Sequence, residues 1–404
     1  MKAVLLIVIS LLYFSSNTKA QEEWTEFKSS MSGSFRYVHN FNNNIVLTSI
    51  NSDYIVIDYE SKEVIKSGKF FEGSVVCEIK VIDDLLYITS LNNNFSDAKV
   101  NIFNENYELV NSYNLSNIIG AATNIHKINN NFYFGLTEYP SNSAMILSSG
   151  DDFSEFKSSY IFENNSNMMV MYDMEYFNNK IYTVYHNGYL LVSSDYGESW
   201  NNKNAFKELY HTIPRQLIVN DMCIMVISDD GYNAVSFDDG DNFIENELLP
   251  IYDFKPYGTI VFDNNSILVS GYSKSTNKGY VLLTKDFGET WEISLETDKQ
   301  IYSLIQVQDK LICQQIDGKL YSINANVISS VESNNIKQSK RVLTTGKLDY
   351  QKSFQNTLEI LDINGNIIEN DIYNVYDNYI DVEGLSKGFY ILKEENNYLQ
   401  FIKY

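Results

Sequence analysis

The sequence contains few of the residue types that form disulfide-stabilised folds and metal centres. There are only 3 cysteines and 4 histidines in 404 residues. An odd number of cysteines without paired spacing gives no disulfide framework, and free cysteines are usually buried. We therefore expect three buried free thiols at Cys77, Cys223 and Cys313. The histidines are not at metal-ligand spacing and no glycine-rich phosphate loop occurs, so the sequence predicts no metal site and no cofactor.

Positive charge and proline are also scarce. The chain has 30 lysines and arginines against 52 aspartates and glutamates, which gives a net charge of −22. Such a chain repels phosphate backbones, so we expect no nucleic-acid partner. Only 4 residues are proline, whereas 31 are tyrosine and 23 are phenylalanine. Together with many asparagine-rich turns, this composition favours an all-β protein.

The one long hydrophobic run lies at the N-terminus. Lys2 precedes an apolar run over residues 3–14, and a polar stretch then ends at Ala20. This pattern predicts a secretory signal peptide over residues 1–20. The run is too short to span a membrane and no later run is longer, so we expect an exported chain without a membrane span.

A short motif recurs along the middle of the chain. It comprises a serine or threonine, an aspartate, a glycine and an aromatic residue at fixed spacing. Three copies carry all four residues: Ser193, Asp195, Gly197, Trp200; Ser236, Asp238, Gly240, Phe243; and Thr284, Asp286, Gly288, Trp291. A fourth copy, over residues 149–156, lacks the glycine. The aspartates, from Asp151 onward, are separated by 44, 43 and 48 residues, a period that predicts the blades of a β-propeller.

A second repeat gives the number of blades. An apolar strand, a turn rich in asparagine or aspartate, and another apolar strand occur seven times, at residues 41–45, 82–86, 128–132, 177–181, 219–223, 262–266 and 307–311. We therefore predict a seven-bladed propeller over residues 21–331, with six blades and an irregular end as the alternative. Residues 24–29 resemble the strands that follow the motif. They should complete the seventh blade beside residues 319–323 and close the ring.

The motif closely resembles the Asp-box, or BNR repeat, of sialidases, sortilin-type receptors and many non-enzymatic secreted propellers. Its aspartate should accept hydrogen bonds from its own turn, its glycine should adopt a positive φ, and its aromatic ring should be buried. Equivalent turns at the edges of different blades cannot converge on one substrate. We therefore interpret the motif as structural and assign no catalytic residue.

The face opposite these turns is the candidate ligand face. Its loops join the second strand of a blade to the third, or one blade to the next. Five of their side chains are candidates for binding a glycan or a protein: Tyr139, His186, Asp229, Tyr232 and Tyr272. Ordinary solvated loops are the alternative.

Enzymatic alternatives have weaker support. A sialidase needs three arginines around a carboxylate. The sequence has only Arg36, Arg215 and Arg341, of which Arg341 lies beyond the seventh blade, and the Arg-Ile-Pro signature of that family is absent. A glycoside hydrolase or lyase needs two opposed carboxylates, and the many acidic residues neither exclude nor select such a pair. The leading hypothesis is a non-enzymatic binding scaffold, with a polysaccharide hydrolase or lyase as the alternative and an assembly factor as a third.

The C-terminal part differs from the repeats. A polar linker over residues 332–340 precedes short apolar strands over residues 341–404, which predict a small, Ig-like β-sandwich. Three stretches, residues 362–365, 385–390 and 401–403, resemble the C-terminal sorting domain of type IX secretion substrates of Bacteroidetes-type bacteria. The opening Tyr-Pro-Asn-Pro of that family is absent, and an unrelated extra sandwich is the alternative. The resemblance implies the secretion machinery as a partner and a secreted or outer-membrane surface location.

Overall fold

The fold is known from a computed structural model. It describes residues 24–94, 97–115, 120–138, 143–162, 170–186, 188–206, 213–220, 223–229, 231–247, 251, 253–262 and 266–326, together with parts of 341–403. The predicted signal peptide and linker lie outside these residues. In the described ranges, no helix is both long and apolar enough to cross a membrane.

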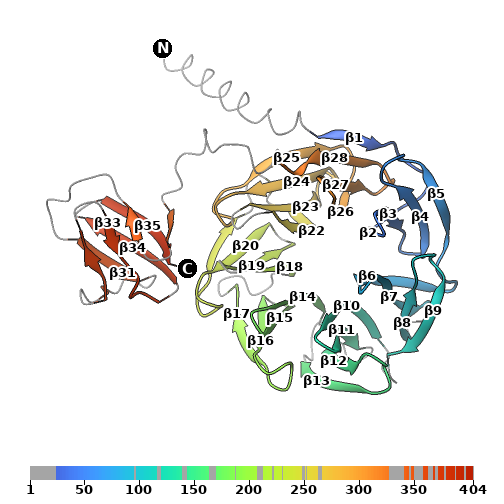
Figure 1. The fold of residues 1–404 in the computed structure, drawn as a ribbon, viewed down its shortest axis with the longest axis horizontal. Coiled ribbons are helices and arrows are strands. Elements are labelled where there is room, and N and C mark those ends of the chain that lie inside the picture. The colour runs from blue at the N-terminus through green and yellow to red at the C-terminus, as the bar shows by residue number, and fades with distance from the viewer. Residues whose placement is uncertain are drawn as a thin grey trace, which may run out of the picture.

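Seven four-stranded antiparallel sheets form a closed ring (Figure 1). Blade 1 contains β2 (Tyr37–Phe41), β3 (Asn44–Thr48), β4 (Asp53–Asp58) and β5 (Val64–Lys69). Blade 2 contains β6 (Ser74–Ile82), β7 (Leu85–Asn92), β8 (Ala98–Phe103) and β9 (Leu109–Asn114). Blade 3 contains β10 (Gly120–Ile128), β11 (Asn131–Glu138), β12 (Ala144–Gly150) and β13 (Phe156–Phe162). Blade 4 contains β14 (Met171–Phe177), β15 (Lys180–Tyr185), β16 (Tyr189–Ser193) and β17 (Asn201–Asn204).

The remaining blades repeat the same order. Blade 5 contains β18 (Pro214–Val219), β19 (Ile224–Ser228), β20 (Tyr232–Ser236) and β21 (Ile244–Glu247). Blade 6 contains β22 (Phe254–Val261), β23 (Ile267–Ser273), β24 (Gly279–Thr284) and β25 (Glu292–Thr297). The seventh contains β26 (Ile301–Val307), β27 (Lys310–Gln315), β28 (Leu320–Asn324) and β1 (Thr25–Lys28). The first strand of each blade lies nearest the axis (Figure 1). The predicted seven-bladed propeller is confirmed.

Strand β1 closes the ring. It pairs antiparallel with β28, with Thr25 opposite Ser322, so the last blade is built from both ends of the propeller sequence. Trp24 is 7% exposed, and its Nε1 donates to Ser294 Oγ of blade 6 at 2.9 Å. The predicted closure by residues 24–29 is therefore confirmed.

The core lies between neighbouring blades. Ile45 and Leu47 of blade 1, for example, cluster with Leu320 of blade 7. The three cysteines are free thiols, as expected, but only two are buried: Cys223 and Cys313. Cys77 is half-buried, because it lies in an inner strand and lines the axial cavity.

The motif turns share one hydrogen-bonding pattern. In the turn after β16, Ser199 N donates to Asp195 Oδ1 at 2.9 Å and Gly197 N donates to Ser193 Oγ at 2.8 Å. The turns at Asp238 and Asp286 repeat both bonds with the equivalent residues. Gly197 has a φ of 85°, and Tyr196 before it has a φ of 56°. The backbone thus takes two successive left-handed residues, of which the second is glycine.

The turn over residues 149–156 is built differently. The sequence pattern placed its aspartate at Asp151, but Asp151 forms an ion pair with Lys127 at 3.1 Å. Asp152 accepts the turn bond from Ser154 N at 3.1 Å instead. Phe153 takes the left-handed φ of 51°. In this turn, which lacks the glycine, the accepting aspartate is thus one residue later than the sequence pattern places it.

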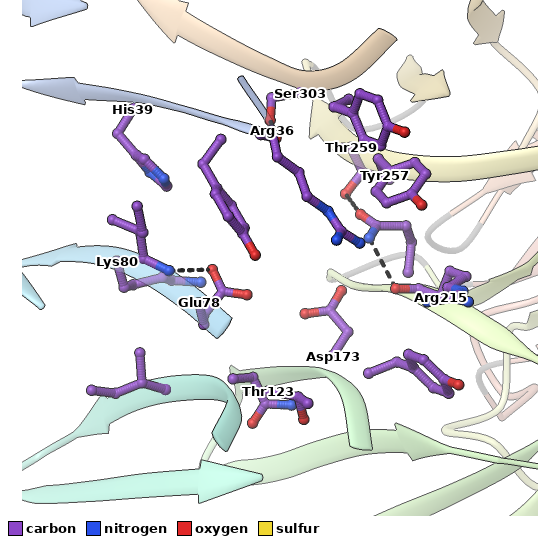
Figure 2. Close-up of a pocket in the computed structure, with 18 of the residues that line it drawn as sticks. Arg36, His39, Glu78, Lys80, Thr123, Asp173, Arg215, Tyr257, Thr259 and Ser303 are labelled. Carbon is purple, nitrogen blue, oxygen red and sulfur yellow. Dashed lines mark hydrogen bonds between the residues drawn. The ribbon is translucent and has the colours of Figure 1, made fainter. Parts of the chain in front are cut away.

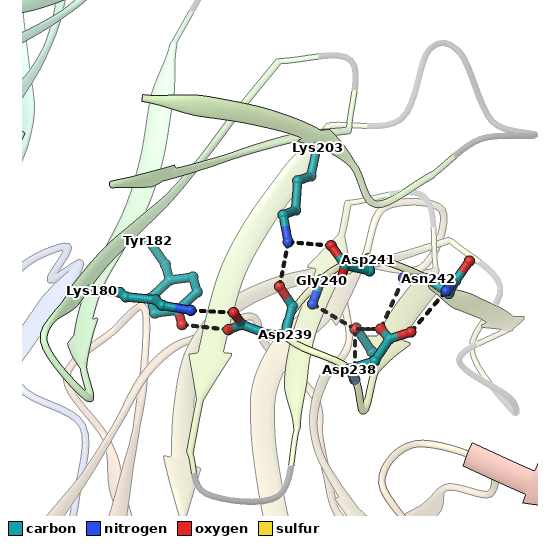
Figure 3. Close-up of polar contacts among 9 residues, drawn as sticks. Lys180, Tyr182, Lys203, Asp238, Asp239, Gly240, Asp241 and Asn242 are labelled. Atoms are coloured by element: carbon teal, nitrogen blue, oxygen red, sulfur yellow. Dashed lines mark hydrogen bonds and ion pairs between the residues drawn. The ribbon is translucent and has the colours of Figure 1, made fainter. Parts of the chain in front are cut away.

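Lysines neutralise the acidic run Asp238–Asp241 (Figure 3). Asp239 accepts from Lys180 Nζ and from Tyr182 Oη, both in blade 4. Lys203 Nζ donates to Asp241 Oδ1 at 2.8 Å and to the carbonyl of Asp239 at 2.6 Å. These contacts join blades 4 and 5. Among the described residues, no group of His, Cys, Asp and Glu side chains could hold a metal ion.

The C-terminal region is a small β-sandwich. One sheet contains β29 (Arg341–Thr344), β35 (Asn397–Lys403), β34 (Gly388–Glu394) and β31 (Leu358–Asp362), and the other contains β30 (Lys347–Asp349), β33 (Tyr379–Asp381) and β32 (Asn374–Val375). Ile360, Ile380 and Leu392 belong to one buried cluster, which includes residues of both sheets. The predicted sandwich tail is confirmed.

Candidate functional site

Six of the seven inner strands are interrupted by a β-bulge near their beginning. In blade 7, Ile301 pairs with Gln315 and Ser303 with Gln314, which leaves Tyr302 as the extra residue. The same shift occurs in blades 2 to 6. In blade 1, Arg36 N donates to Thr48 O, although Thr48 is already paired with Tyr37. A bulge bends its strand and redirects the extra side chain.

The six bulge residues, and Arg36 just before β2, surround one axial cavity. We call them the bulge ring: Arg36, Cys77, Thr123, Tyr172, Arg215, Tyr257 and Tyr302. All of them line a cavity of about 590 Å³ on the propeller axis. The residues that follow them line it too, including Glu78, Asp173 and Ser303 (Figure 2). Each blade therefore contributes side chains to a single site.

Tyrosines and cations are concentrated at the start of the inner strands. Tyr257 stacks on Tyr272 with centroids 5.8 Å apart and meets Tyr302 edge-on at 4.7 Å. The Arg36 guanidinium lies 5.5 Å from the Tyr257 ring and 5.9 Å from the Tyr302 ring. Lys255 Nζ lies 5.7 Å from the Tyr257 ring. The contacts place positive charge over electron-rich faces, which is a favourable arrangement.

Arg215 is balanced by a buried carboxylate. Its guanidinium lies 4.5 Å from the Tyr172 ring, and its Nη2 is 3.2 Å from Asp229 Oδ2. Asp229 is 6% exposed, and its Oδ1 has no hydrogen-bond partner within the described ranges. The Nδ1 of His186 is likewise buried without a partner in those ranges. Burial lowers the pKa of His186. Arg215 lines the cavity, whereas Asp229 and His186 lie behind it.

Three carboxyl groups, those of Glu78, Asp173 and Glu175, line the cavity. Asp173 accepts 2.9 Å hydrogen bonds from Met174 N and from Leu217 N of the next blade. Glu78 accepts a 2.9 Å bond from Ile79 N. Burial raises the pKa of Glu78 to about 7 and that of Asp173 to about 6. Burial and the nearby Asp173 charge raise the pKa of Glu175 to about 7. Near neutral pH these groups can both donate and accept hydrogen bonds.

Two histidines also line the cavity. Burial lowers the pKa of His39 to about 3 and that of His126 well below its usual value. Both rings are therefore neutral at physiological pH.

The candidate ligand-face residues are distributed around this site. Tyr272 belongs to the tyrosine cluster, and His186 and Asp229 lie near Arg215. Tyr232 does not line the cavity and packs against the core between blades 4 and 5. Tyr139 lies outside the described residues. The sequence reasoning missed the bulge ring, whose only visible signal was a polar or aromatic residue where each inner apolar strand begins.

The C-terminal region has a recognisable family. Residues 343–403 match the family described as the secretion system C-terminal sorting domain. The chain carries a type IX secretion sorting domain. This sorting domain indicates export, with secretion or a cell-surface location, and interaction with the secretion machinery.

Solved structures resemble the propeller at low sequence identity. YCF48 from Cyanidioschyzon merolae is 7% identical with a TM-score of 0.54 and covers 75% of this chain and 99% of its own. A structure of YCF48 bound to D1 peptide is 11% identical with a TM-score of 0.52 and covers 75% and 95%. The WD40 propeller domain of Doa1 is 12% identical with a TM-score of 0.52 and covers 74% and 95%. These likenesses show the fold alone. No curated protein matches the sequence.

Proposed function

We propose that this protein is an exported, non-enzymatic propeller that binds a glycan or a protein at the mouth of its axial cavity. The observation that carries the proposal is the bulge ring, because six strand bulges and Arg36 direct side chains from all seven blades into one cavity of about 590 Å³. Bulges commonly occur beside binding and active sites. Pockets with a few convergent polar groups are the usual ligand sites.

The propeller is of the Asp-box type in this proposal. Three turns share the same serine or threonine, aspartate and glycine contacts, which supports the type. In each, the carboxylate is engaged by its own turn, which supports a structural role and leaves the ligand to the axis. The host would be a Bacteroidetes-type bacterium.

The domain boundaries follow the same scheme. We place the signal peptide at residues 1–20, the propeller at 21–331, the linker at 332–340 and the sorting domain at 341–404. The chain would cross the inner membrane by its signal peptide and the outer membrane by its tail, and then be released or held at the surface.

Binding can be tested with the exported full-length chain. Glycan and peptide arrays should reveal a ligand, and its affinity should fall at least tenfold in Tyr302→Ala. Tyr196→Ala, an exposed ring at a motif turn, is the matched control and should bind normally. If Tyr302→Ala binds as well as the unchanged protein, the axial mouth is not the ligand site.

A polysaccharide hydrolase or lyase is the second candidate. It is favoured by the raised pKa of Glu78, to about 7, because a carboxyl group that is protonated near neutral pH can act as a general acid. Asp173 fits less well, since both its oxygens accept backbone hydrogen bonds. Turnover of a polysaccharide that disappears in Glu78→Gln would overturn the non-enzymatic proposal.

A further inference from the structure

We propose that the ligand of the axial mouth is an acidic glycan, whose carboxylate is bound by Arg36 while its sugar rings lie on the tyrosine cluster. This inference rests on the proposed binding function and specifies its ligand. Its first support is the position of the Arg36 side chain, which lines the cavity and points into it (Figure 2).

The backbone of Arg36 is held on both sides. Its N–H donates to Thr48 O at 3.0 Å, and its carbonyl accepts from Ser303 Oγ of blade 7 at 3.0 Å. The guanidinium is flanked by the rings of Tyr257 and Tyr302. A binding group that is held in place before the ligand arrives loses less entropy on binding.

Arg36 and Arg215 differ in their ion pairing. Across the described part of the chain, Arg36 forms no ion pair, whereas Arg215 is paired with Asp229. Lys255 adds a second positive charge beside the same tyrosine. Of these two cations, Arg36 is the one that lines the cavity. The guanidinium fork matches a carboxylate in geometry and charge.

The surroundings of Arg36 favour a sugar over a peptide. Tyr257, Tyr272 and Tyr302 form an aromatic cluster against which the apolar face of a pyranose can pack. Glu78 and Asp173 line the same cavity and can accept hydrogen bonds from hydroxyl groups. An extended peptide would add to a free strand edge, but a bulge bends six of the seven inner strands.

The test uses two uronate tetrasaccharides, tetragalacturonate and tetramannuronate, and the methyl ester of each. Calorimetry with the full-length exported chain should show binding of at least one acid, and at least tenfold weaker binding of its ester. Arg36→Gln should weaken binding of the acid by a similar factor and leave binding of the ester unchanged. Lys99→Gln, which removes one charge from an exposed position on β8, should bind the acid normally.

Arg36→Lys keeps the charge but loses the fork, and should weaken binding of the acid several-fold. Arg36→Lys is also the variant to compare with the unchanged protein if Arg36→Gln does not fold. Equal binding of acid and ester would overturn the carboxylate inference, while loss of both in Tyr302→Ala would leave the proposed function intact. Binding of a glutamate-rich peptide, and of no uronate, would overturn the assignment to a glycan. If no member of the arrays binds, the proposed function fails as well.

Discussion

At the scale of single residues, the motif aspartates act within their own turns. Asp286 is 7% exposed and accepts a 2.9 Å bond from Thr290 N and a 2.6 Å bond from Thr290 Oγ1. Its Oδ1 also accepts from Thr284 Oγ1 at 2.8 Å. The carboxylate therefore satisfies three donors that would otherwise be left in a tightly packed turn.

We expect Asp286→Ala to lower the free energy of unfolding by about 1–3 kcal/mol, because it leaves a buried N–H without an acceptor. Urea unfolding would measure the loss. Asp151→Ala is the control, since Asp151 makes an exposed ion pair and no turn bond, and it should change stability by less than about 0.5 kcal/mol. Loss of ligand binding in an Asp286→Ala protein of unchanged stability would contradict the structural role.

A second residue-scale prediction concerns Glu78 and pH. Burial raises its pKa from 4.5 to about 7, so the folded chain keeps a proton that the unfolded chain releases in this interval. The favourable contribution is complete below about pH 4.5 and is lost as the pH rises through 7. Glu78→Gln removes this dependence. Relative to the unchanged protein, its free energy of unfolding should improve by about 1–2 kcal/mol between pH ~5 and pH ~8, after allowance for solvent screening.

The comparison with the unchanged protein isolates this effect. His39 titrates in the opposite sense, because its lowered pKa costs stability as the pH falls below 6.5, but it is present in both proteins. Asp173 follows the direction of Glu78 and is also common to both. Parallel pH profiles of stability for the two proteins would show that Glu78 is not shifted.

At the scale of strands, the closing contact depends on β1 and the residue before it. Trp24 packs against blade 6 as well as extending blade 7, through its bond to Ser294 and its contacts with a cluster that includes Leu295. Trp24→Ala should therefore cost about 3–5 kcal/mol, the usual range for a buried tryptophan. Trp200→Ala should cost less, because that ring is half-exposed. Thermal unfolding of both variants would show whether closure requires Trp24, and equal losses would contradict this.

The strand scale also shows what the sequence could predict. The seven blades and the closure were predictable, because the repeats recur over long distances and hydrophobic alternation needs only a few residues to be visible. The bulge ring was not, because each bulge lies one to three residues into its strand. There, one added residue cannot be distinguished from a loop residue. Tyr272 and Asp229 were found because the polar stretches next to them in the sequence mark loops, although Tyr272 itself lies near the end of β23. Arg36 and Tyr302 lie at the beginning of apolar inner strands, where the sequence gives no such signal.

At the scale of the whole molecule, two parts have separate roles. The propeller closes with its own N-terminal strand, so none of its seven blades needs a strand from the tail. The tail has its own sheets and its own buried cluster, and it matches the sorting domain over residues 343–403. Separate folding of the two parts predicts that export and ligand binding can be uncoupled by truncation.

Truncation after Ser333 should leave a folded propeller in the periplasm of a host that has type IX secretion. Its stability should equal that of the full chain, because the seven blades and β1 are all retained. In the reciprocal experiment, residues 333–404 fused behind a signal peptide and a reporter should carry the reporter past the outer membrane. Cell fractionation and circular dichroism would measure location and folding. Normal secretion of the truncated chain would contradict the sorting role of the tail, and failure of that chain to fold would show that the ring needs the tail.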